Sequence, residues 1–264
     1  MNYKIKTKIE QGLNPIVSPS TTDLTFLNFG VLSLPEGKEY STTSEADCET
    51  VLIILSGNCN LEIDGELYDG LGQREGVFDG KATAAFLPTE YPYTVEANSD
   101  VEVAVVEAPA ENDGDPQIIM PEDIEAVPSG RDTWERSFHK IIMDNVDSKS
   151  LFISETFNQP GKWSSYPPHR HDIYNPPEEM PLEELYFYRL QPEQGFGMQR
   201  IYTQDRGLDE AYAVEHNDTV IFPKGYHPTC AAPGYDLYYL WLIAGEERVL
   251  EATQDPDHAW VAEE

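Results

Sequence analysis

The sequence predicts an all-β protein built from two small barrels, and three observations support this prediction. Twenty prolines and 18 glycines interrupt the 264 residues, and this composition favours short strands and turns over long helices. Short apolar runs end repeatedly at a glycine or proline, as in β-sandwiches and barrels. The same spacing of 39 residues separates Glu49 from Pro88 and Glu184 from Pro223, which predicts that one unit occurs twice.

In the first half, a polar segment precedes a series of expected strands. Residues 1–25 are rich in Thr, Ser and Pro, and we expect an extended arm or an edge strand there. Residues 49–56 form an apolar run that ends at Gly57, the pattern of a buried strand. The other strands expected in this half are residues 24–29, 61–64, 84–87 and 101–106.

A change of composition divides the chain near its middle. Residues 110–116 carry almost no apolar side chains and are the best candidate for a linker. We therefore expect an N-terminal barrel at residues 1–115 and a C-terminal barrel at residues 116–264. The strands expected in the second barrel are residues 138–143, 151–157, 184–189, 195–202, 219–223 and 235–241.

The charge of the chain excludes several classes of partner. With 48 acidic and 17 basic residues, the formal net charge is −31, so nucleic acids and anionic membranes are poor partners. A well-solvated acidic surface is the plain interpretation, and adaptation to salt is the alternative. Any anionic substrate would need a local basic pocket in such a protein.

Cysteine usage and the N-terminus bear on location. The three cysteines are odd in number and lack CxxC spacing, which indicates free thiols in a reducing cytoplasm. The basic residues 1–8 are not followed by an apolar segment, so we expect no secretory signal. No apolar run approaches the length of a membrane span. These features predict a cytoplasmic protein.

Three histidines and one carboxylate form a candidate metal site. His169 and His171 are two residues apart, so an extended strand places them on the same face. His227 follows a Pro/Gly turn further along the chain. Such residues are suitable ligands for a borderline metal such as zinc. By default, the remaining histidines are interpreted as ordinary surface or core residues: His139, His216 and His258.

The carboxylate is either Glu183 or Glu184, and strand alternation favours the second. Glu184, Tyr186 and Tyr188 share one face of a strand, while Glu183 lies on the other face with apolar neighbours. The lining of a barrel site is polar and its outer packing face is apolar. We therefore predict that Glu184 points into the site.

The candidate ligands occur only in the second copy of the repeat. When the copies are aligned by their common spacing, Tyr91 corresponds to Tyr226 and Pro92 corresponds to His227. The region before Glu49 contains no histidine. We therefore expect a metal in the C-terminal barrel and none in the N-terminal barrel.

These motifs resemble those of the cupin superfamily, and in more detail those of the 5-deoxy-glucuronate isomerases of myo-inositol catabolism. The resemblance covers the whole chain and is most specific over residues 160–260. Two features depart from simple cupins. The loop between His171 and Glu184 is longer, and the segment Pro223-x-Gly225-x-His227 (PxGxH) is one residue shorter than the usual cupin motif PxGxxH. The matching segments are residues 165–172, 184–189, 195–203, 225–228 and 234–240.

The resemblance implies a bicupin, two tandem double-stranded β-helix (jelly-roll) barrels with few short helices. It implies His169, His171, Glu184 and His227 as ligands of a divalent metal. Zinc is expected because a related isomerase, the 5-keto-4-deoxyuronate isomerase of pectin breakdown, is a zinc bicupin; manganese and iron are the alternatives. The implied reaction is aldose–ketose isomerisation, an intramolecular oxidoreduction that converts 5-deoxy-D-glucuronate to 2-deoxy-5-keto-D-gluconate.

That chemistry requires a Lewis acid and a proton carrier. The candidate catalytic groups are Glu184, Tyr186 and Tyr188, with a metal-held hydroxide as an alternative carrier. Arg200 and Lys224 are the candidate partners of the substrate carboxylate because they lie closest in sequence to the motifs. We expect a small sugar acid as substrate, and a homo-oligomer as one form of assembly. A metal-dependent cupin dioxygenase and a non-catalytic sugar-binding cupin remain alternative functions.

Overall fold

The computed structural model of this chain describes residues 2–111 and 113–263 and consists almost entirely of β-strands. The only helical segments among these residues are two short 3₁₀ turns, η1 (Asp132–Trp134) and η2 (Ala259–Ala262). In the described part of the chain, no helix is long and apolar enough to cross a membrane. The all-β prediction is confirmed, and the dense Gly/Pro punctuation accounts for the many short strands.

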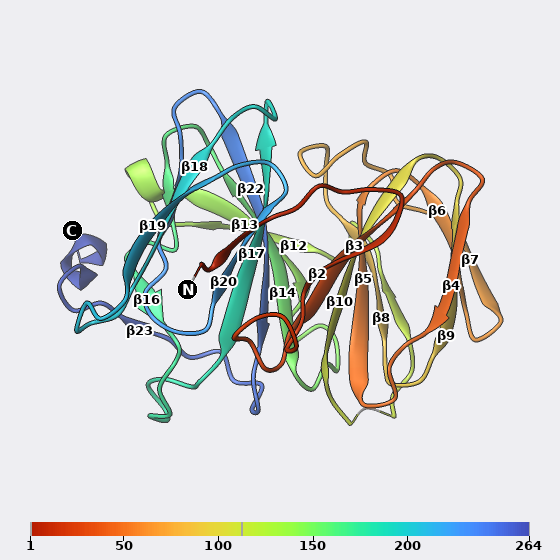
Figure 1. Ribbon diagram of the computed structural model, residues 1–264, viewed down its shortest axis with the longest axis horizontal. Coiled ribbons are helices and arrows are strands. Elements are labelled where there is room, and N and C mark those ends of the chain that lie inside the picture. Colours follow the sequence, from red (N-terminus) through yellow and green to blue (C-terminus); the bar gives the residue numbers. More distant parts are fainter. Residues whose placement is uncertain (1, 112, 264) are drawn as a thin grey trace. The chain divides into compact units, whose positions relative to one another are not determined.

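The chain divides into two compact units (Figure 1). The N-terminal unit comprises Lys8–Glu125 and Lys140–Phe152. The C-terminal unit comprises Met1–Thr7, Ala126–His139 and Ile153–Glu264. These bounds differ from a simple division at residue 115, because the first residues of the chain belong to the C-terminal unit and a later segment belongs to the N-terminal one.

In the N-terminal unit, a six-stranded sheet and a four-stranded sheet enclose an apolar core. The six-stranded sheet has the order β11-β8-β5-β10-β3-β2, with strands Gln117–Ile119, Thr83–Leu87, Cys48–Ser56, Val101–Pro109, Asn28–Leu34 and Gly12–Val17. The four-stranded sheet has the order β4-β9-β6-β7, with strands Glu39–Thr43, Pro92–Ala97, Cys59–Ile63 and Glu66–Leu71. Their facing side chains form a core of Leu, Ile, Val and Ala.

The C-terminal unit repeats this arrangement. Its seven-stranded sheet has the order β1-β20-β17-β22-β14-β13-β12, with strands Lys4–Lys6, Asp218–Phe222, Glu183–Gln191, Asp236–Ala244, Leu151–Asn158, Arg136–Ile142 and Glu125–Ser129. Its four-stranded sheet has the order β15-β21-β18-β19, with strands Trp163–Ser164, Thr229–Ala231, Gly197–Tyr202 and Asp209–Val214. A separate two-stranded ladder joins β16 (His169–Arg170) to β23 (Thr253–Gln254).

The two units match in the three central strands of their large sheets. The central strands β5, β8 and β10 correspond to β17, β20 and β22, and each pair differs by 135 residues at both ends. The pairings also agree, because β5 lies between β8 and β10 as β17 lies between β20 and β22. The predicted repeat and the predicted pair of barrels are therefore confirmed.

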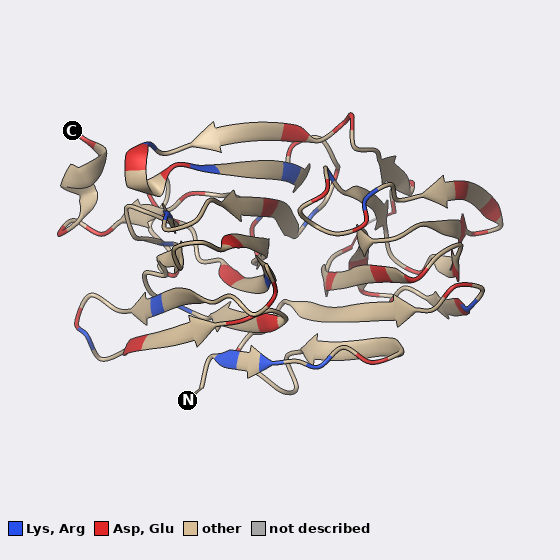
Figure 2. Ribbon diagram, turned by 90° about the horizontal axis from the view of Figure 1, so that it is seen from above, with Lys and Arg blue, Asp and Glu red and all other residues tan. Residues whose placement is uncertain are grey.

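The interiors of the two units differ in chemistry. A small cavity in the N-terminal unit is lined by aliphatic side chains and Cys59. At the corresponding position, the interior of the C-terminal unit contains histidine, glutamate and tyrosine side chains, described below. Both units carry a surplus of Asp and Glu over Lys and Arg (Figure 2).

Part of the N-terminal arm forms an edge strand, β1, which is one of the two structures expected for this segment. β1 pairs with β20 at the edge of the large sheet of the C-terminal unit, with Lys4 opposite Val220. The ammonium group of Lys4 lies 3.2 Å from the buried carboxylate of Asp218. An arm anchored in this way leaves β20 paired on both sides close to the turn that carries His227.

Candidate metal centre

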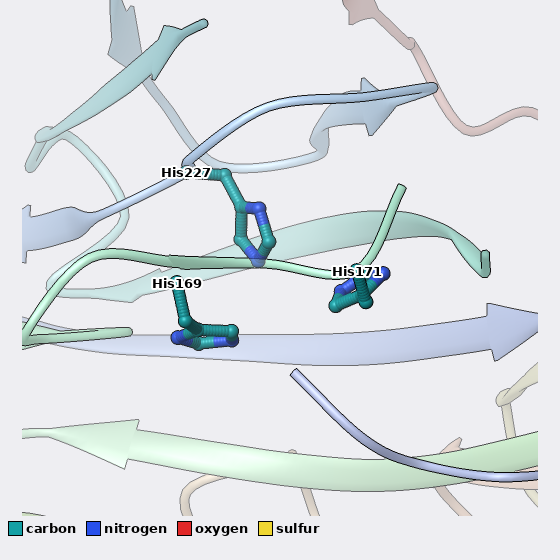
Figure 3. A group of neighbouring side chains, drawn as sticks. All are labelled: His169, His171 and His227. Atoms are coloured by element: carbon teal, nitrogen blue, oxygen red, sulfur yellow. The ribbon is translucent and has the colours of Figure 1, made fainter. Parts of the chain in front are cut away.

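Three histidine side chains converge inside the C-terminal unit. His169 lies on β16 (His169–Arg170), and His171 is the first residue after this strand. The alternation of an extended chain therefore directs both rings to the same side. His227 approaches from the turn after β20. One ring nitrogen from each of the three lies within 4.8 Å of the others (Figure 3). Such a set can hold a metal ion.

The turn that carries His227 depends on Gly225. Gly225 has a φ of +90°, and a Cβ at this position would lie 2.7 Å from the carbonyl oxygen of Tyr202. Its N–H donates to Asp172 Oδ2 at 2.7 Å, and its carbonyl accepts from His227 Nδ1 at 2.9 Å. Only glycine fits this turn without strain, and the turn sets the orientation of the His227 ring.

Glu184 completes the cluster from the neighbouring strand. β17 pairs with β20 so that Glu184 lies opposite Phe222. Its Oε2 atom is 3.0 Å from Nε2 of His171 and 3.0 Å from Nε2 of His227. Glu183 precedes it on the strand and faces the opposite side of the sheet. Of the two glutamates considered from the sequence, the structure therefore brings Glu184 to the histidines.

The hydrogen bonds around the rings fit a metal ion at their centre. Nδ1 of His171 lies 2.8 Å from the carbonyl of Leu182, and Nδ1 of His227 contacts the carbonyl of Gly225. A carbonyl only accepts, so Nδ1 of each ring carries a proton, and in the neutral ring the lone pair of Nε2 is then directed to the side of Glu184, where a cation can bind it. Nε2 of His227 has no hydrogen-bond partner among the described residues. A cation between these lone pairs and the carboxylate would satisfy all of them.

The electrostatics of the metal-free cluster give His169 and Glu184 the ionisation states that a metal requires, whereas His171 is shifted toward its protonated form. Burial, assisted by the charges of His227 and His171, lowers the pKa of His169 to about 3 and keeps this ring neutral. Burial opposes ionisation of Glu184, but His227 and the hydrogen bond from His171 outweigh it and lower the pKa of Glu184 to about 2. Burial also lowers the pKa of His171, yet its bond to Glu184 shifts that pKa upward overall.

The two tyrosines predicted on the strand of Glu184 are buried beside the cluster. The ring of Tyr186 lies 6.0 Å from that of His227, and its hydroxyl is 2.6 Å from Ser165 Oγ. The hydroxyl of Tyr188 donates to Gln199 Oε1 at 2.6 Å. Burial raises the pKa of both phenols well above its ordinary value, so both are protonated at neutral pH. Tyr186 is the one whose ring contacts a candidate ligand.

Sequence reasoning missed three polar residues that share this interior. Tyr239 on β22 stacks on Tyr186 with ring centroids 4.2 Å apart. Its hydroxyl lies 2.6 Å from Ser164 Oγ, and Ser165 contacts Tyr186. The sequence predicts a strand over the aromatic run of β22. Which of its tyrosines points inward depends on the register with β17, where Tyr239 lies opposite Tyr188.

The predicted substrate-binding cations lie away from the cluster. Arg200 is on the opposite face of β18 from Gln199, whose amide points inward to the His227 carbonyl. The Arg200 guanidinium donates two hydrogen bonds to the carboxylate of Asp209, at 2.8 and 2.9 Å. Lys224 is exposed on the turn before Gly225. The structure therefore does not bring Arg200 or Lys224 into contact with the histidines.

A cavity of about 590 Å³ opens in the C-terminal unit. Arg200 forms part of its wall, and so do Pro168 and Pro228, the neighbours of His169 and His227 in the chain. The rest of the wall is mostly aromatic or basic and includes Arg131, Trp134, Trp163, Tyr166, Tyr202 and His258. The cavity is thus large enough for a sugar and borders the segments that carry the cluster.

The fold and the cluster define the class of protein: a bicupin with a three-histidine, one-glutamate site in its second barrel. The fold is shared with the oxalate decarboxylase of Lactobacillus farciminis, with a TM-score of 0.70, 12% identity, and coverage of 100% of this chain and 91% of the other. A model of the KduI/IolB family matches residues 4–261. The chain belongs to the KduI/IolB family.

Curated relatives match over nearly their full length. The 5-deoxy-glucuronate isomerase of Geobacillus thermodenitrificans is 37% identical over 255 residues, which cover 96% of this chain and 93% of the relative. That of Bacillus subtilis strain 168 is 36% identical over 249 residues, covering 94% and 92%. The crystal structure of an IolB-like protein from Salmonella typhimurium matches with a TM-score of 0.95 and 33% identity, covering 99% of this chain and 100% of that one.

Proposed function

We propose that this protein is a metal-dependent aldose–ketose isomerase of myo-inositol catabolism, which converts 5-deoxy-D-glucuronate to 2-deoxy-5-keto-D-gluconate. The observation that carries the proposal is the convergence of His169, His171, His227 and Glu184. It occurs in a chain 36–37% identical, over more than nine-tenths of its length, to proteins named as 5-deoxy-glucuronate isomerases.

The proposed metal ligands are His169, His171, Glu184 and His227. Three imidazoles with one carboxylate favour zinc, with manganese or iron as alternatives. When bound, the metal supplies Lewis acidity that polarises the carbonyl and hydroxyl oxygens between which the carbonyl is moved. The hydrogen bonds from His171 and His227 to backbone carbonyls keep both rings oriented for this purpose.

The chain's own residues would hold and move the proton between adjacent carbons. Tyr186 is our preferred carrier, because its ring contacts His227 and its hydroxyl exchanges a hydrogen bond with Ser165. Tyr188 supports it from the same strand face and holds Gln199, whose amide in turn donates to the His227 carbonyl. A phenol with a raised pKa can donate a proton at neutral pH and needs a partner to accept one. In addition to its role as a ligand, Glu184 is the carboxylate on the same strand face as Tyr186 and is our proposed acceptor.

Arg200 and Lys224 remain proposed contacts for the anionic substrate. Arg200 lies in the wall of the cavity beside Tyr202, and Lys224 is exposed on the turn that leads to His227. In a chain of net charge −31, cations at an entrance would offset the repulsion of an approaching uronate.

The test is elemental analysis of the purified protein followed by an isomerase assay on 5-deoxy-glucuronate, with and without a chelator. We expect about one equivalent of metal and an activity that disappears on chelation and returns with the metal. Oxygen consumption with iron would instead indicate the dioxygenase alternative. Tight sugar binding without turnover would indicate a non-catalytic sugar-binding protein.

The division into an N-terminal domain (residues 1–115) and a C-terminal domain (residues 116–264), a cytoplasmic location and a homo-oligomeric state also remain proposals. Three free cysteines support the cytoplasm. The pairing of β1 with β20 argues that a fragment of residues 116–264 would need the N-terminal arm for stability. Unfolding of that fragment with and without a peptide of residues 1–7 tests the division into domains. Light scattering of the full chain tests the homo-oligomeric state.

A further inference from the structure

Two polar side chains on the large sheet of the C-terminal unit have no place in the mechanism above: Arg136 on β13 and Asn158 on β14. In this sheet β22, β14 and β13 are consecutive strands. One of its faces is marked by ring contacts, because His139 lies 4.6 Å from Phe157, and Phe157 lies 5.3 Å from Tyr238. These three residues therefore share a face.

Strand alternation puts the two polar residues on the opposite face. Asn158 and Tyr239 each follow a residue of the first face, and Arg136 is three positions before His139. Tyr239 stacks on Tyr186, so this second face is the one that contains Glu184 and the cluster. The positive charge of Arg136 also acts on Tyr239, where it opposes the burial that raises the pKa of that phenol. Arg136 therefore lies on the face of the sheet that carries Tyr239 and Glu184.

Asn158 is a buried amide without a partner. Its side chain is 2% exposed, and neither its Nδ2 nor its Oδ1 atom has a hydrogen-bond partner in the described part of the chain. An unpaired buried polar group destabilises a fold by about 1–3 kcal/mol. Because Asn158 lies on the sheet face that carries Glu184, a ligand bound at the cluster is the natural source of the missing partner.

Arg136 is held in position but not neutralised. Its guanidinium donates a long hydrogen bond, 3.4 Å, to the carbonyl of Trp134 and lies 5.9 Å from the Trp134 ring. Gly130 makes room for it, because a Cβ there would lie 2.8 Å from Arg136 Nη1. Among the described residues no carboxylate forms an ion pair with Arg136, although the chain has 48 acidic residues.

We infer that Arg136 and Asn158 form a carboxylate-binding subsite beside the histidine cluster, which holds the acid group of a uronate. A guanidinium pairs with a carboxylate through two parallel N–H bonds, and the Asn158 amide adds a neutral donor. The inference rests on the proposed function for the identity of the substrate. In this arrangement Arg136, and not Arg200, binds the substrate carboxylate beside the cluster, because two donors of Arg200 already bind Asp209.

The experiment compares Arg136→Met and Arg136→Lys with wild-type protein and with Lys162→Met. Lys162 pairs with Glu135 at 2.7 Å, so its variant removes the same charge close by but outside the subsite. Steady-state kinetics on 5-deoxy-glucuronate are measured at matched metal content. We expect kcat/KM to fall roughly ten- to hundred-fold in Arg136→Met, mainly through KM, with partial rescue in Arg136→Lys. Lys162→Met should stay near wild type.

A binding measurement keeps the inference separate from the proposed reaction. Calorimetry with D-glucuronate and with D-glucose, on the same holoproteins, should show loss of the preference for the acid sugar in Arg136→Met and in Asn158→Asp. If wild type does not isomerise 5-deoxy-glucuronate, the proposed function fails, and this preference still tests the subsite. Unchanged discrimination in Arg136→Met, with wild-type metal content, overturns the subsite. A larger loss in Arg200→Lys than in Arg136→Lys would also overturn it in favour of the cavity wall.

Discussion

Glu49 and Glu184 occupy corresponding positions in the two units, 135 residues apart, yet their surroundings give them different roles. Glu49 is fully buried, and its carboxylate accepts hydrogen bonds from Ser148 Oγ and from the backbone N–H groups of Lys149, Ser150 and Leu151. The carboxylate of Glu184 instead faces two imidazoles. The same side chain at the same strand position therefore stabilises a loop in one unit and faces the histidine cluster in the other.

The first prediction contrasts these two glutamates. Glu49→Gln should destabilise the protein by about 1.5–3 kcal/mol, because hydrogen bonds to a charged acceptor are lost, while the metal content stays at the wild-type level. Glu184→Gln should lose most of its metal and activity. Glu183→Gln, on the outer face of the same strand, is the matched control. Urea unfolding and elemental analysis measure the two effects; equal metal loss in all three variants would contradict the assignment.

The second prediction concerns the stability of the metal-free protein in mild acid. The folded pKa of His169, about 3, is lower than its ordinary value of 6.5. The unfolded chain therefore binds more protons between these values, and stability is complete above pH 6.5 and falls as the pH falls. Between pH 7 and pH 5 the loss from this residue should be about 2 kcal/mol. Urea midpoints should show it, and His169→Gln should lower this pH dependence; an equal dependence in the variant would contradict the assignment.

At the scale of elements, short turns and ladders place the cluster more than the strands do. His169 is held by a two-stranded ladder with β23, close to the C-terminus. His227 is held by a turn whose backbone is tied to Asp172 and passes against Tyr202. Only Glu184 and the tyrosines come from the centre of a long strand. The positions of the ligands therefore depend on segments with few hydrogen bonds of their own, joined by specific contacts.

The third prediction tests the turn before His227. Gly225→Ala should weaken metal binding at least ten-fold, because the added Cβ would collide with the Tyr202 carbonyl and displace His227. Gly234→Ala is a suitable control: Gly234 has a similar φ of +89°, but a Cβ there meets no atom within 4 Å. Metal titration of the two purified variants distinguishes collision at the site from backbone strain alone. Similar affinities would mean that the turn tolerates the displacement.

At the scale of the whole molecule, two units of one architecture share a single candidate metal centre among the described residues. The described residues contain a single group of histidines with metal-ligand spacing, and it lies in the C-terminal unit. The interior of the N-terminal unit is filled with aliphatic side chains instead. An apolar interior cannot replace the hydration of a cation, so binding of a metal ion there would be unfavourable.

The fourth prediction follows from this asymmetry. The protein should bind one metal ion per chain, and His171→Ala should reduce the content to near zero, whereas His216→Ala should not. Removal of the metal should lower the free energy of unfolding by about 2.7 kcal/mol when the free metal had been at a hundred times its dissociation constant. Elemental analysis and thermal unfolding with and without chelator provide the measurements. Two equivalents in the wild type would mean that the N-terminal unit also binds metal.

The sequence alone determined the features that depend on local spacing. The period of an extended chain puts His169 and His171 on one side and separates Glu184 from Glu183, and the proline and glycine of the turn identify the segment of His227. The two copies were visible because β5 and β17, and the strands paired with them, keep one offset. These signals lie within a few residues of each other or repeat at a fixed distance.

Only the tertiary structure decided the contacts between distant segments. It paired β1 with β20, engaged Arg200 with Asp209 across a hairpin, and placed Arg136 and Asn158 on the sheet face that carries Glu184. The sequence could not show these, because the side chains that a strand faces are set by the strands beside it. Strand order in a sheet joins residues separated by tens to hundreds of positions, and no local pattern records which ones meet.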